Sequence, residues 1–346
     1  MLEKSIKSSK IIGVGSALID LLINENDSFL VQLGKKKGGM TLVTDSDIEE
    51  ILKKTRNKPL VVPGGATCNT IIGIAKLGGK AGFIGKRGDD FYGASYEENL
   101  KKLNVKTLFL TSPTPTGKVL SIITPDAQRS MFTYLGASTE LESEHITQEM
   151  FMDSTIALME GYLLFKPELM LACLKKAKAA GSVIALDLAS FEVVEASKTT
   201  LKDIITEYVD ILIANEDEAR SYTGFSDEHK ALDSLSENVQ IAVLKVGPRG
   251  SYISYKNTNC IKSKRAATKG EIPYEVVRIY AKTDQSPKDT TGAGDLWAAG
   301  FLYGIANGYS LEKSGEIASA CGYEVCQVVG AQIPEEGWQR IRRLLT

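Results

Sequence analysis

The sequence predicts an α/β protein, in which a mostly parallel central sheet lies between two layers of helices and carries a small β-sheet lid. Three observations lead to this prediction. Short apolar segments alternate with amphipathic ones, two threonine-rich regions interrupt that alternation, and a glycine-rich turn precedes a helical run near the C-terminus. At roughly 150 residues per domain, a chain of 346 residues suggests two domains or one large domain with an appendage.

The alternating segments predict the central sheet. Strands are expected at Ile11–Val14, Leu60–Val62, Ala81–Ile84, Ile156–Met159, Val183–Leu186, Ile211–Ile213 and Ile241–Val246. Helices are expected at Thr67–Leu77, Phe91–Leu103, Pro167–Ala180 and Glu216–Tyr222. Strands that are apolar almost throughout and alternate with helices are typical of a parallel sheet covered on both faces. We therefore expect a three-layer α/β/α core.

Two regions, 17–60 and approximately 106–136, predict the lid. They contain strand-like segments, among them Thr107–Thr111, Lys118–Thr124 and Ser130–Tyr134, without a long helix between them. We expect these two excursions to form a smaller, more antiparallel sheet that can close over a site on the core. The core would then comprise residues 10–16, 61–105 and 137–346. Within the polar segment 266–287 we expect one short strand, Glu275–Tyr280.

Composition excludes several classes of function. The chain has 41 Lys+Arg and 43 Asp+Glu, and this near-neutral balance argues against nucleic acid or an anionic membrane as the main partner. No apolar run approaches the ~18 residues of a membrane span, and the polar N-terminal segment is a poor secretion signal, so we expect a cytoplasmic protein. The five cysteines include no C-x-x-C pair and are expected to be reduced thiols. With only two histidines, any general base is expected to be a carboxylate.

The most informative segment, Asp289 to Phe301, reads D-T-T-G-A-G-D-L-W-A-A-G-F. A helix N-terminus exposes unpaired N–H groups, and glycines there allow an anion to approach the backbone. We predict that Gly292, Ala293 and Gly294 form an anion hole for a phosphoryl group. Asp295 beside it would accept a proton from an attacking hydroxyl group. The alternative is that Asp295 only caps the helix.

Other nucleotide-binding motifs are missing. The sequence has no G-x-x-x-x-G-K-[ST], which argues against a P-loop protein. The turn Gly13-Val14-Gly15 begins like a dinucleotide-binding turn but lacks the third glycine, which argues against a dinucleotide oxidoreductase.

Over about residues 10–335 the sequence resembles the PfkB, or ribokinase-like, family of carbohydrate and nucleoside kinases, and within it the adenosine-kinase-like members. The segment Asp289–Phe301 resembles the C-terminal signature of that family. The remaining motifs, in family order, are Pro63–Asn69 followed by Ala75–Gly79, then Gly85–Gly93, Asn215–Glu218 and Gly247–Gly250. The resemblance implies a ribokinase-like core with a β lid, ATP as phosphate donor, and Mg²⁺.

The resemblance also implies roles for individual residues. Asp295 would be the general base beside the anion hole of Gly292, Ala293 and Gly294. Arg129 would close on the phosphates. The nucleotide side would comprise Asn215 and Glu218, which organise Mg²⁺ largely through water, together with Lys245, Gly247 and Gly250. The hydroxyl groups of the acceptor would be held by Ser16, Asp20, Gly64, Gly65 and Asn69. Some family members bind a monovalent cation such as K⁺, for which the matching positions are Asp289, Thr291 and the Gly330 carbonyl.

Structural alternatives exist for several of these residues. Asp20 could be an ordinary residue of a strand end, and Asn69 could cap a helix. Asn215 and Glu218 match a helix capping box. Arg129 could be a solvated charge on a hairpin.

We predict an ATP-dependent kinase that phosphorylates the primary hydroxymethyl group of a small molecule, a nucleoside of the adenosine type or a sugar. Ser16 stands where adenosine kinases usually have Asn, and Leu163 follows Tyr162 where many have a second aromatic residue. These departures leave a fructokinase- or ribokinase-type activity on a free sugar as the alternative. A non-catalytic sensor of a nucleoside or sugar is a further alternative. We expect a monomer or a homodimer.

Overall fold

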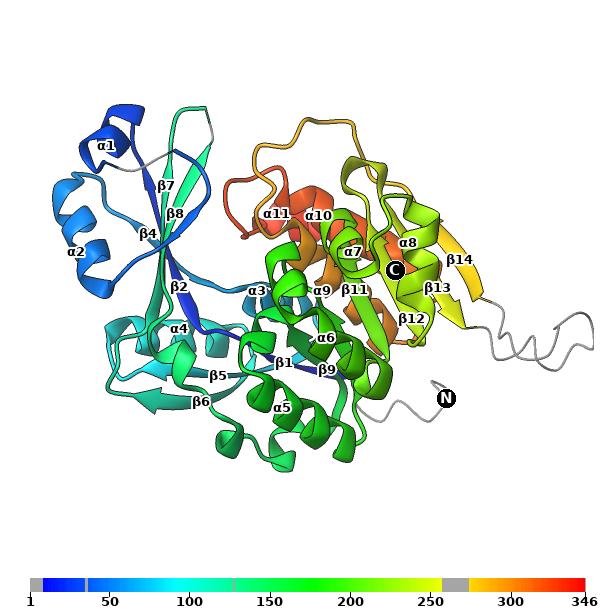
Figure 1. Ribbon diagram of the computed structural model, residues 1–346. Helices are drawn as coiled ribbons and strands as arrows, with labels where there is room; N and C mark the ends of the chain where they lie inside the picture. Colours follow the sequence, from blue (N-terminus) through cyan, green and yellow to red (C-terminus); the bar gives the residue numbers. More distant parts are fainter. Residues whose placement is uncertain (1–8, 35–36, 127, 257–273, 346) are drawn as a thin grey trace, which may run out of the picture.

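The structure, a computed structural model, describes residues 9–34, 37–126, 128–256 and 274–345. Its strands form a nine-stranded main sheet and a separate five-stranded sheet (Figure 1). The α/β prediction with a small additional sheet is therefore confirmed.

The main sheet is parallel over seven strands and antiparallel at one edge. Its strands, in spatial order, are β14 (Tyr274–Ile279), β13 (Ser251–Lys256), β12 (Ile241–Lys245), β11 (Ile211–Asn215), β10 (Val183–Asp187), β9 (Ser154–Glu160), β1 (Lys10–Val14), β5 (Lys80–Gly88) and β6 (Lys106–Ser112). The central strands of this sheet are apolar and almost completely buried, because helices cover both faces of the sheet. The strand expected at 275–280 is β14.

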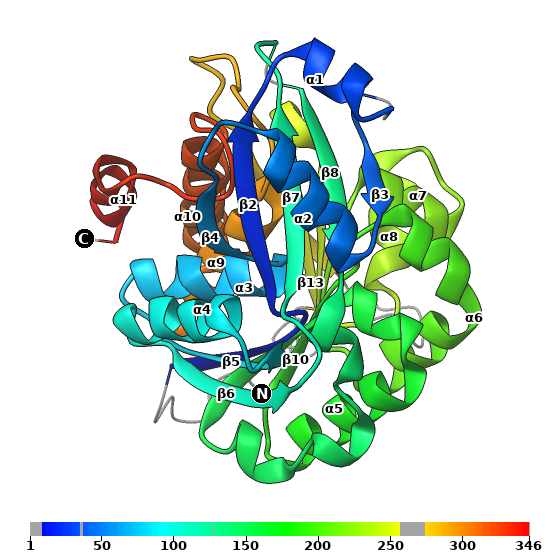
Figure 2. The ribbon, with the colours of Figure 1, turned by 90° about the vertical axis from the view of Figure 1, so that its left-hand side faces the viewer.

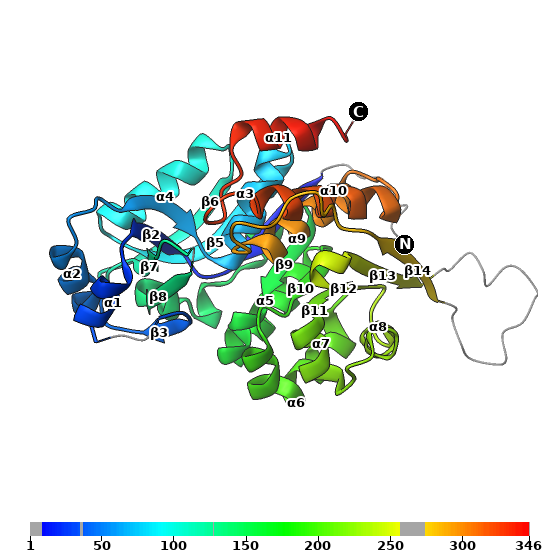
Figure 3. The same cartoon turned by 90° about the horizontal axis from the view of Figure 1, so that it is seen from above.

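Two layers of helices enclose the main sheet (Figure 3). One layer comprises α3 (Ala66–Lys76), α4 (Phe91–Lys102), α9 (Ala293–Ala306), α10 (Leu311–Val325) and α11 (Glu335–Arg342). The other comprises α5 (Pro167–Ala179), α6 (Phe191–Tyr208), α7 (Glu216–Thr223) and α8 (Glu228–Ser236). Each layer has its own apolar cluster against the sheet. Short 3₁₀ helices are η1 (Gly136–Glu140), η2 (Ser143–His145), η3 (Gln148–Phe151), η4 (Gly161–Phe165) and η5 (Gly247–Arg249).

The five-stranded sheet, which we call the lid, has the order β3 (Met40–Leu42), β8 (Arg129–Tyr134), β7 (Gly117–Ile123), β2 (Leu18–Asn24) and β4 (Leu60–Gly64). Two helices, α1 (Asp27–Gln32) and α2 (Asp45–Lys54), cover its side away from the main sheet (Figures 1 and 2). In β2, Ile19 and Leu21 are buried in the same apolar cluster as these helices. Because side chains alternate along a strand, Asp20 lies on the opposite, uncovered face.

Three predictions about these elements are wrong. The segment at 107–111 was expected in the lid, but β6 pairs in parallel with β5 at the edge of the main sheet, after the crossover helix α4. Leu60–Val62 was expected in the core, but β4 pairs antiparallel with β2 in the lid. The region 17–60 does contain a helix of ten residues, α2, which starts at a capping box formed by Thr44 and Asp47. Both misplaced strands are edge strands, whose half-exposed residues do not distinguish one sheet from the other.

Four cysteines are free thiols, of which Cys68, Cys173 and Cys321 are buried and Cys326 is half-buried. The fifth, Cys260, lies outside the described residues. Among the helices of the described chain, none combines the length and apolar composition that crossing a bilayer requires.

Candidate active site

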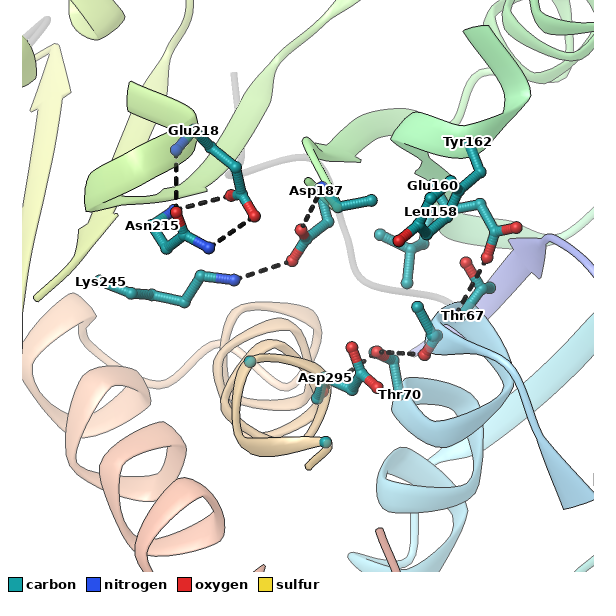
Figure 4. Close-up of a pocket in the computed structure, with 14 residues that line it drawn as sticks. Thr67, Thr70, Leu158, Glu160, Tyr162, Asp187, Asn215, Glu218, Lys245 and Asp295 are labelled. Atoms are coloured by element: carbon teal, nitrogen blue, oxygen red, sulfur yellow. Dashed lines mark hydrogen bonds and ion pairs between the residues drawn. The ribbon is translucent and has the colours of Figure 1, made fainter. Parts of the chain in front are cut away.

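Four neighbouring strands of the main sheet each end in a polar residue. β9, β10, β11 and β12 end in Glu160, Asp187, Asn215 and Lys245, respectively. All four residues line one pocket, with a volume of about 280 Å³ (Figure 4). Ligands of open α/β sheets bind at this carboxyl edge of the strands. The other residues that line the pocket are Ala66, Thr67, Thr70, Leu158, Tyr162, Ala189, Glu218, Gly292, Gly294 and Asp295.

The start of α9 forms another wall of the pocket. Gly292 precedes the helix in the left-handed conformation (φ +73°), and a Cβ atom there would lie 2.6 Å from the Cβ of Ala331. The first internal hydrogen bond of the helix joins Leu296 N to Gly292 O. The N–H groups of Gly294 and Asp295 therefore have no acceptor among the described residues. We call these two amides the anion hole.

Of the three residues predicted for the anion hole, Gly292, Ala293 and Gly294, these two amides keep only Gly294 and add Asp295. The N–H group of Ala293 donates to the Thr290 carbonyl at 3.1 Å, and Ala293 does not line the pocket. It is therefore engaged in closing the turn. Gly292 lines the pocket and adopts the left-handed backbone conformation that this turn requires.

Asp295 lies in the first turn of α9 and is fully buried. Its carboxylate accepts a hydrogen bond from Asn69 Nδ2 at 2.9 Å, and its carbonyl accepts one from Thr70 Oγ1 at 3.0 Å. Burial raises the pKa of Asp295 to about 7, although the hydrogen bond from Asn69 opposes this shift. The side chain of Asp295 does not cap α9, because the N-cap of α9 is Gly292. The side chain of Asn69 does not cap α3, because the N-cap of α3 is Gly65. The capping alternatives for Asp295 and Asn69 are therefore wrong.

Asn215 and Glu218 form the capping box of α7, as the structural alternative predicts. Asn215 N and Nδ2 donate to the Glu218 carboxylate at 2.8 and 2.6 Å, and Glu218 N donates back to Asn215 Oδ1 at 2.9 Å. Both residues also line the pocket. Burial raises the pKa of Glu218 to about 7.

Lys245 and Asp187 form an ion pair across the pocket floor. Lys245 Nζ lies 3.1 Å from Asp187 Oδ2, although the intervening strand β11 separates their own strands. A Cβ atom on Gly294 would lie 3.1 Å from the same Nζ. The ammonium group is therefore adjacent to the anion hole.

Glu160 joins the two chain segments that lead to and from the first half of the lid. Its Oε1 accepts a hydrogen bond from Ser16 N at 3.0 Å, between β1 and β2. Its Oε2 accepts one from Thr67 N at 3.2 Å, just after β4 has returned from the lid. A Cβ atom on Gly15 would lie 2.5 Å from Oε2, so this approach requires glycine. Ser16 was predicted to hold the acceptor. Its own backbone N–H group is held in place by Glu160.

We expect Glu160→Gln to lower the free energy of unfolding by about 1–3 kcal/mol. The amide group would turn an N–H group toward one of the two backbone donors and leave that donor unsatisfied. Urea unfolding measures the change. Glu195→Gln, at an exposed position on α6, is the matched control and is expected to stay within about 0.5 kcal/mol of the wild type. Equal unfolding midpoints for the two variants would contradict this role of Glu160.

Asp20 on β2 and Gly64 on β4 are diagonal neighbours in the lid, where Gly64 pairs with Leu18 and Asp20 with Val62. A Cβ atom on Gly64 would lie 2.5 Å from Asp20 Oδ2, so the carboxylate occupies the space that a side chain at 64 would fill. Burial raises the pKa of Asp20 to about 6, and the charge of Arg129 opposes the shift. Within the described chain we find no hydrogen-bond donor to this carboxylate. Gly65 continues from Gly64 with φ +93°, and a Cβ atom there would lie 2.5 Å from the Ser16 carbonyl.

Arg129 connects the lid to the loop before α9. It donates to Ser121 Oγ at 2.7 Å and to the Thr291 hydroxyl, and lies 3.5 Å from Asp289 Oδ2. Its side chain is only 9% exposed, so the alternative of a solvated hairpin charge is wrong. Arg129 does not line the pocket in this structure, and its Nε is buried without a partner in the described chain.

Asp289, predicted to hold a monovalent cation, has its carboxylate filled by protein donors. Oδ1 accepts from Thr291 N at 2.9 Å and Oγ1 at 2.7 Å, and Oδ2 accepts from Gly330 N at 2.8 Å. Because the guanidinium of Arg129 also neutralises its charge, these residues do not fit K⁺ at that carboxylate.

Gly247 is the first residue of η5, which follows β12, and Gly250 comes directly after η5; their φ angles are +53° and +98°. They lie outside the residues that line the pocket, although Lys245 at the end of the same strand is among them.

Glu160 and Asp187 were not predicted from the sequence. Each is a carboxylate directly after an apolar strand segment, and that position is the signal by which they could have been found. Thr67 and Thr70 were also missed, although they lie beside the predicted Asn69 on α3. Tyr162 was noted only as part of the resemblance.

Comparison with known proteins identifies the family. The family model described as pfkB family carbohydrate kinase matches residues 28–338. The chain belongs to this family. It is therefore a kinase, as the sequence predicts, and ATP is the phosphate donor that this membership implies.

Individual relatives agree with this assignment. A nucleoside kinase of Methanocaldococcus jannaschii is 28% identical over 284 residues, which cover 80% of this chain and 83% of the relative. The crystal structure of a probable sugar kinase from Rhizobium etli has a TM-score of 0.82 and 28% identity, covering 96% of this chain and 98% of that one. The crystal structure of an adenosine kinase from Sinorhizobium meliloti has a TM-score of 0.81 and 28% identity, and the match covers 97% of this chain and 99% of that one.

Proposed function

We propose that this pfkB-family kinase transfers the γ-phosphoryl group of ATP to the primary hydroxymethyl group of a nucleoside, with Asp295 as general base. One observation carries the proposal. A buried carboxylate with a raised pKa shares one pocket with free amides at a helix N-terminus (Figure 4). The amides can stabilise the transferred phosphoryl group while the carboxylate accepts the proton of the attacking hydroxyl group.

The donor side of the pocket fits a magnesium nucleotide. Asn215 and Glu218 supply oxygen atoms at the pocket wall, but their mutual hydrogen bonds leave them suited to contact through water. Mg²⁺ usually keeps several waters and takes few protein ligands in such sites. When bound, it would neutralise charge on the phosphates. Gly247 and Gly250 would border the nucleotide, and Arg129 would turn its unpartnered Nε toward the phosphates.

The acceptor side is proposed to lie between the lid and α3. Asp20, whose carboxylate has no donor within the described chain, can accept hydrogen bonds from two neighbouring hydroxyl groups of a ribose-like ring. Gly64 leaves room for the Asp20 carboxylate and Gly65 for the Ser16 carbonyl on this side, and Asn69 donates a hydrogen bond to the Asp295 carboxylate. Glu160 fixes the entry and exit of the lid around the same space.

We favour a nucleoside over a free sugar because Tyr162 lines the pocket with 43% of its surface exposed. Its ring is available to stack on a base. The neighbouring Leu163 is buried in the core and offers no second surface. The names of the Methanocaldococcus and Sinorhizobium relatives support the nucleoside, whereas that of the Rhizobium relative supports the alternative, a free sugar.

An ATP-consumption assay with Mg²⁺ and a panel of adenosine, inosine, guanosine, ribose and fructose tests the proposal. We expect ADP formation with a nucleoside at a higher kcat/KM than with either sugar. If only ribose or fructose is turned over, the acceptor is a free sugar and not a nucleoside. Tight binding of a panel member without any turnover would indicate a sensor and overturn the proposed kinase reaction.

A further inference from the structure

We infer that Lys245 is a catalytic residue that binds the transferred phosphoryl group, and that Asp187 is a positioning residue that holds the Lys245 ammonium group beside the anion hole. This inference deepens the proposed function and rests on it. It starts from the strand ends of the main sheet. Asp187 is the last residue of β10 and Lys245 the last residue of β12, and their side chains meet in the pocket (Figure 4).

The charges that line the pocket are unbalanced. Glu160, Asp187, Glu218 and Asp295 contribute four carboxyl groups, and Lys245 is the only Lys or Arg among the lining residues of the described chain. A nucleotide brings several more negative charges into the same space. Besides any bound Mg²⁺, Lys245 is therefore the one lining group that can offset the charge of the incoming phosphates.

Lys245 is held as a cation. Burial disfavours the charged ammonium group, but the carboxylates of Asp187 and Glu218 outweigh that effect and raise the pKa of Lys245 above its ordinary value. Its side chain is 13% exposed, so the charge acts through a medium in which water screens it little.

The ammonium group has hydrogen-bonding capacity left for a ligand. An ammonium group has three N–H donors, and the described chain uses one of them, in the bond to Asp187 Oδ2 at 3.1 Å. The same Nζ would lie 3.1 Å from a Cβ atom on Gly294. The two unused donors therefore lie next to the free amides of Gly294 and Asp295, where a phosphoryl group would be bound.

Asp187 is suited to hold this position. Its Oδ1 accepts a hydrogen bond from Ala189 N at 3.1 Å, which fixes the carboxylate, while Oδ2 binds Lys245. Without Asp187, the flexible lysine side chain would have no anchor at the pocket floor. An ion pair between Asp187 and Lys245 would add little to the stability of the fold, because the free energy cost of burying two charges is about as large as the gain from their attraction.

In the proposed step the bond between the γ-phosphorus and the ADP oxygen breaks as the bond to the acceptor oxygen forms. The proton of the acceptor hydroxyl group moves to Asp295, and ADP leaves with the electron pair of the broken bond. Lys245 forms no covalent bond. It donates hydrogen bonds to non-bridging oxygens of the phosphoryl group, whose negative charge the neighbouring amides also stabilise.

Steady-state kinetics of Lys245→Met, Lys245→Arg, Asp187→Asn and the double variant Asp187→Asn/Lys245→Met test the inference. We expect Lys245→Met to lower kcat by about 100- to 1,000-fold with little change in KM for the acceptor. Lys245→Arg should recover part of that loss. Asp187→Asn should lower kcat by up to about 100-fold, because it misplaces the ammonium group. Lys202→Met, at an exposed position on α6, is the matched control and should behave as the wild type.

The double variant separates positioning from a direct role. If Asp187 acts through Lys245, the double variant should be no slower than Lys245→Met alone. Additive losses would overturn the positioning role. Wild-type kcat in folded Lys245→Met, with a lowered melting temperature, would overturn the whole inference and leave a structural ion pair. If Lys245→Met does not fold, Asp187→Asn decides, and unchanged kcat in that variant overturns the inference. Because the wild-type enzyme is measured in parallel, its failure to turn over ATP would count against the proposed kinase reaction instead.

Discussion

Asp295→Asn is expected to lower kcat by about 10²–10⁴-fold and to leave KM for ATP close to the wild-type value. The asparagine side chain keeps the shape of the aspartate and can still meet Asn69, but it cannot accept the proton of the acceptor hydroxyl group. The free amides of Gly294 and Asp295 belong to the backbone and are retained. Initial rates at saturating ATP and acceptor measure the loss.

Asp203→Asn, at an exposed position on α6, is the matched control for this substitution and should leave kcat unchanged. The pH profile adds an independent check. Because burial raises the pKa of Asp295 to about 7, the base is increasingly protonated below that pH. The wild-type kcat/KM should therefore fall as the pH decreases through about 7, approaching tenfold per pH unit. Residual activity of Asp295→Asn should still show a weaker decrease, because Glu218, whose pKa burial also raises to about 7, still titrates there in the same pocket. Wild-type turnover in Asp295→Asn would end the assignment of Asp295 as base.

The sequence predicted the parts of the site that a continuous motif specifies. The turn from Asp289 to Asp295 carries both the glycine that starts α9 and the carboxylate that enters the pocket, so its role follows from one local segment. Asn69 was predicted near the acceptor, and the structure adds that it donates to Asp295 from a different helix. That contact depends on how α3 packs against α9, which no local pattern specifies.

Glu160 and Asp187 could not be selected in this way. Many apolar strands are followed by a carboxylate, and such a residue becomes informative only when its strand is known to neighbour others that end in polar residues. The order β9-β10-β11-β12 brings Glu160, Asp187, Asn215 and Lys245 to one edge. The same dependence on pairing explains the errors at β4 and β6. Their sequences predict strands correctly, but the partner of an edge strand is decided by the tertiary structure.

Asp20→Asn is expected to remove most of the selectivity of the enzyme for acceptors that carry two neighbouring ring hydroxyl groups. In the wild type each hydrogen bond from a hydroxyl group to this carboxylate should contribute about 1.5–3 kcal/mol, which corresponds to roughly 10- to 150-fold in kcat/KM. An acceptor that lacks one hydroxyl group leaves a buried carboxylate partly unsatisfied, so the enzyme should discriminate against it. The measurement compares adenosine with 2′-deoxyadenosine and 3′-deoxyadenosine at pH 8, where Asp20, with a pKa of about 6, is ionised.

The comparison between acceptors distinguishes a direct contact from a general effect on the lid. If Asp20 binds the hydroxyl groups, Asp20→Asn should reduce kcat/KM strongly for adenosine and weakly for the deoxy acceptors, which have already lost the contact. If Asp20 only supports the lid beside Gly64, all three acceptors should lose activity by the same factor. Asp27→Asn on the opposite side of the lid, where Asp27 forms an exposed ion pair with Lys37, should change none of these ratios. A uniform loss in Asp20→Asn would therefore place the acceptor away from Asp20, while the role of Asp295 as base would still stand on its own test.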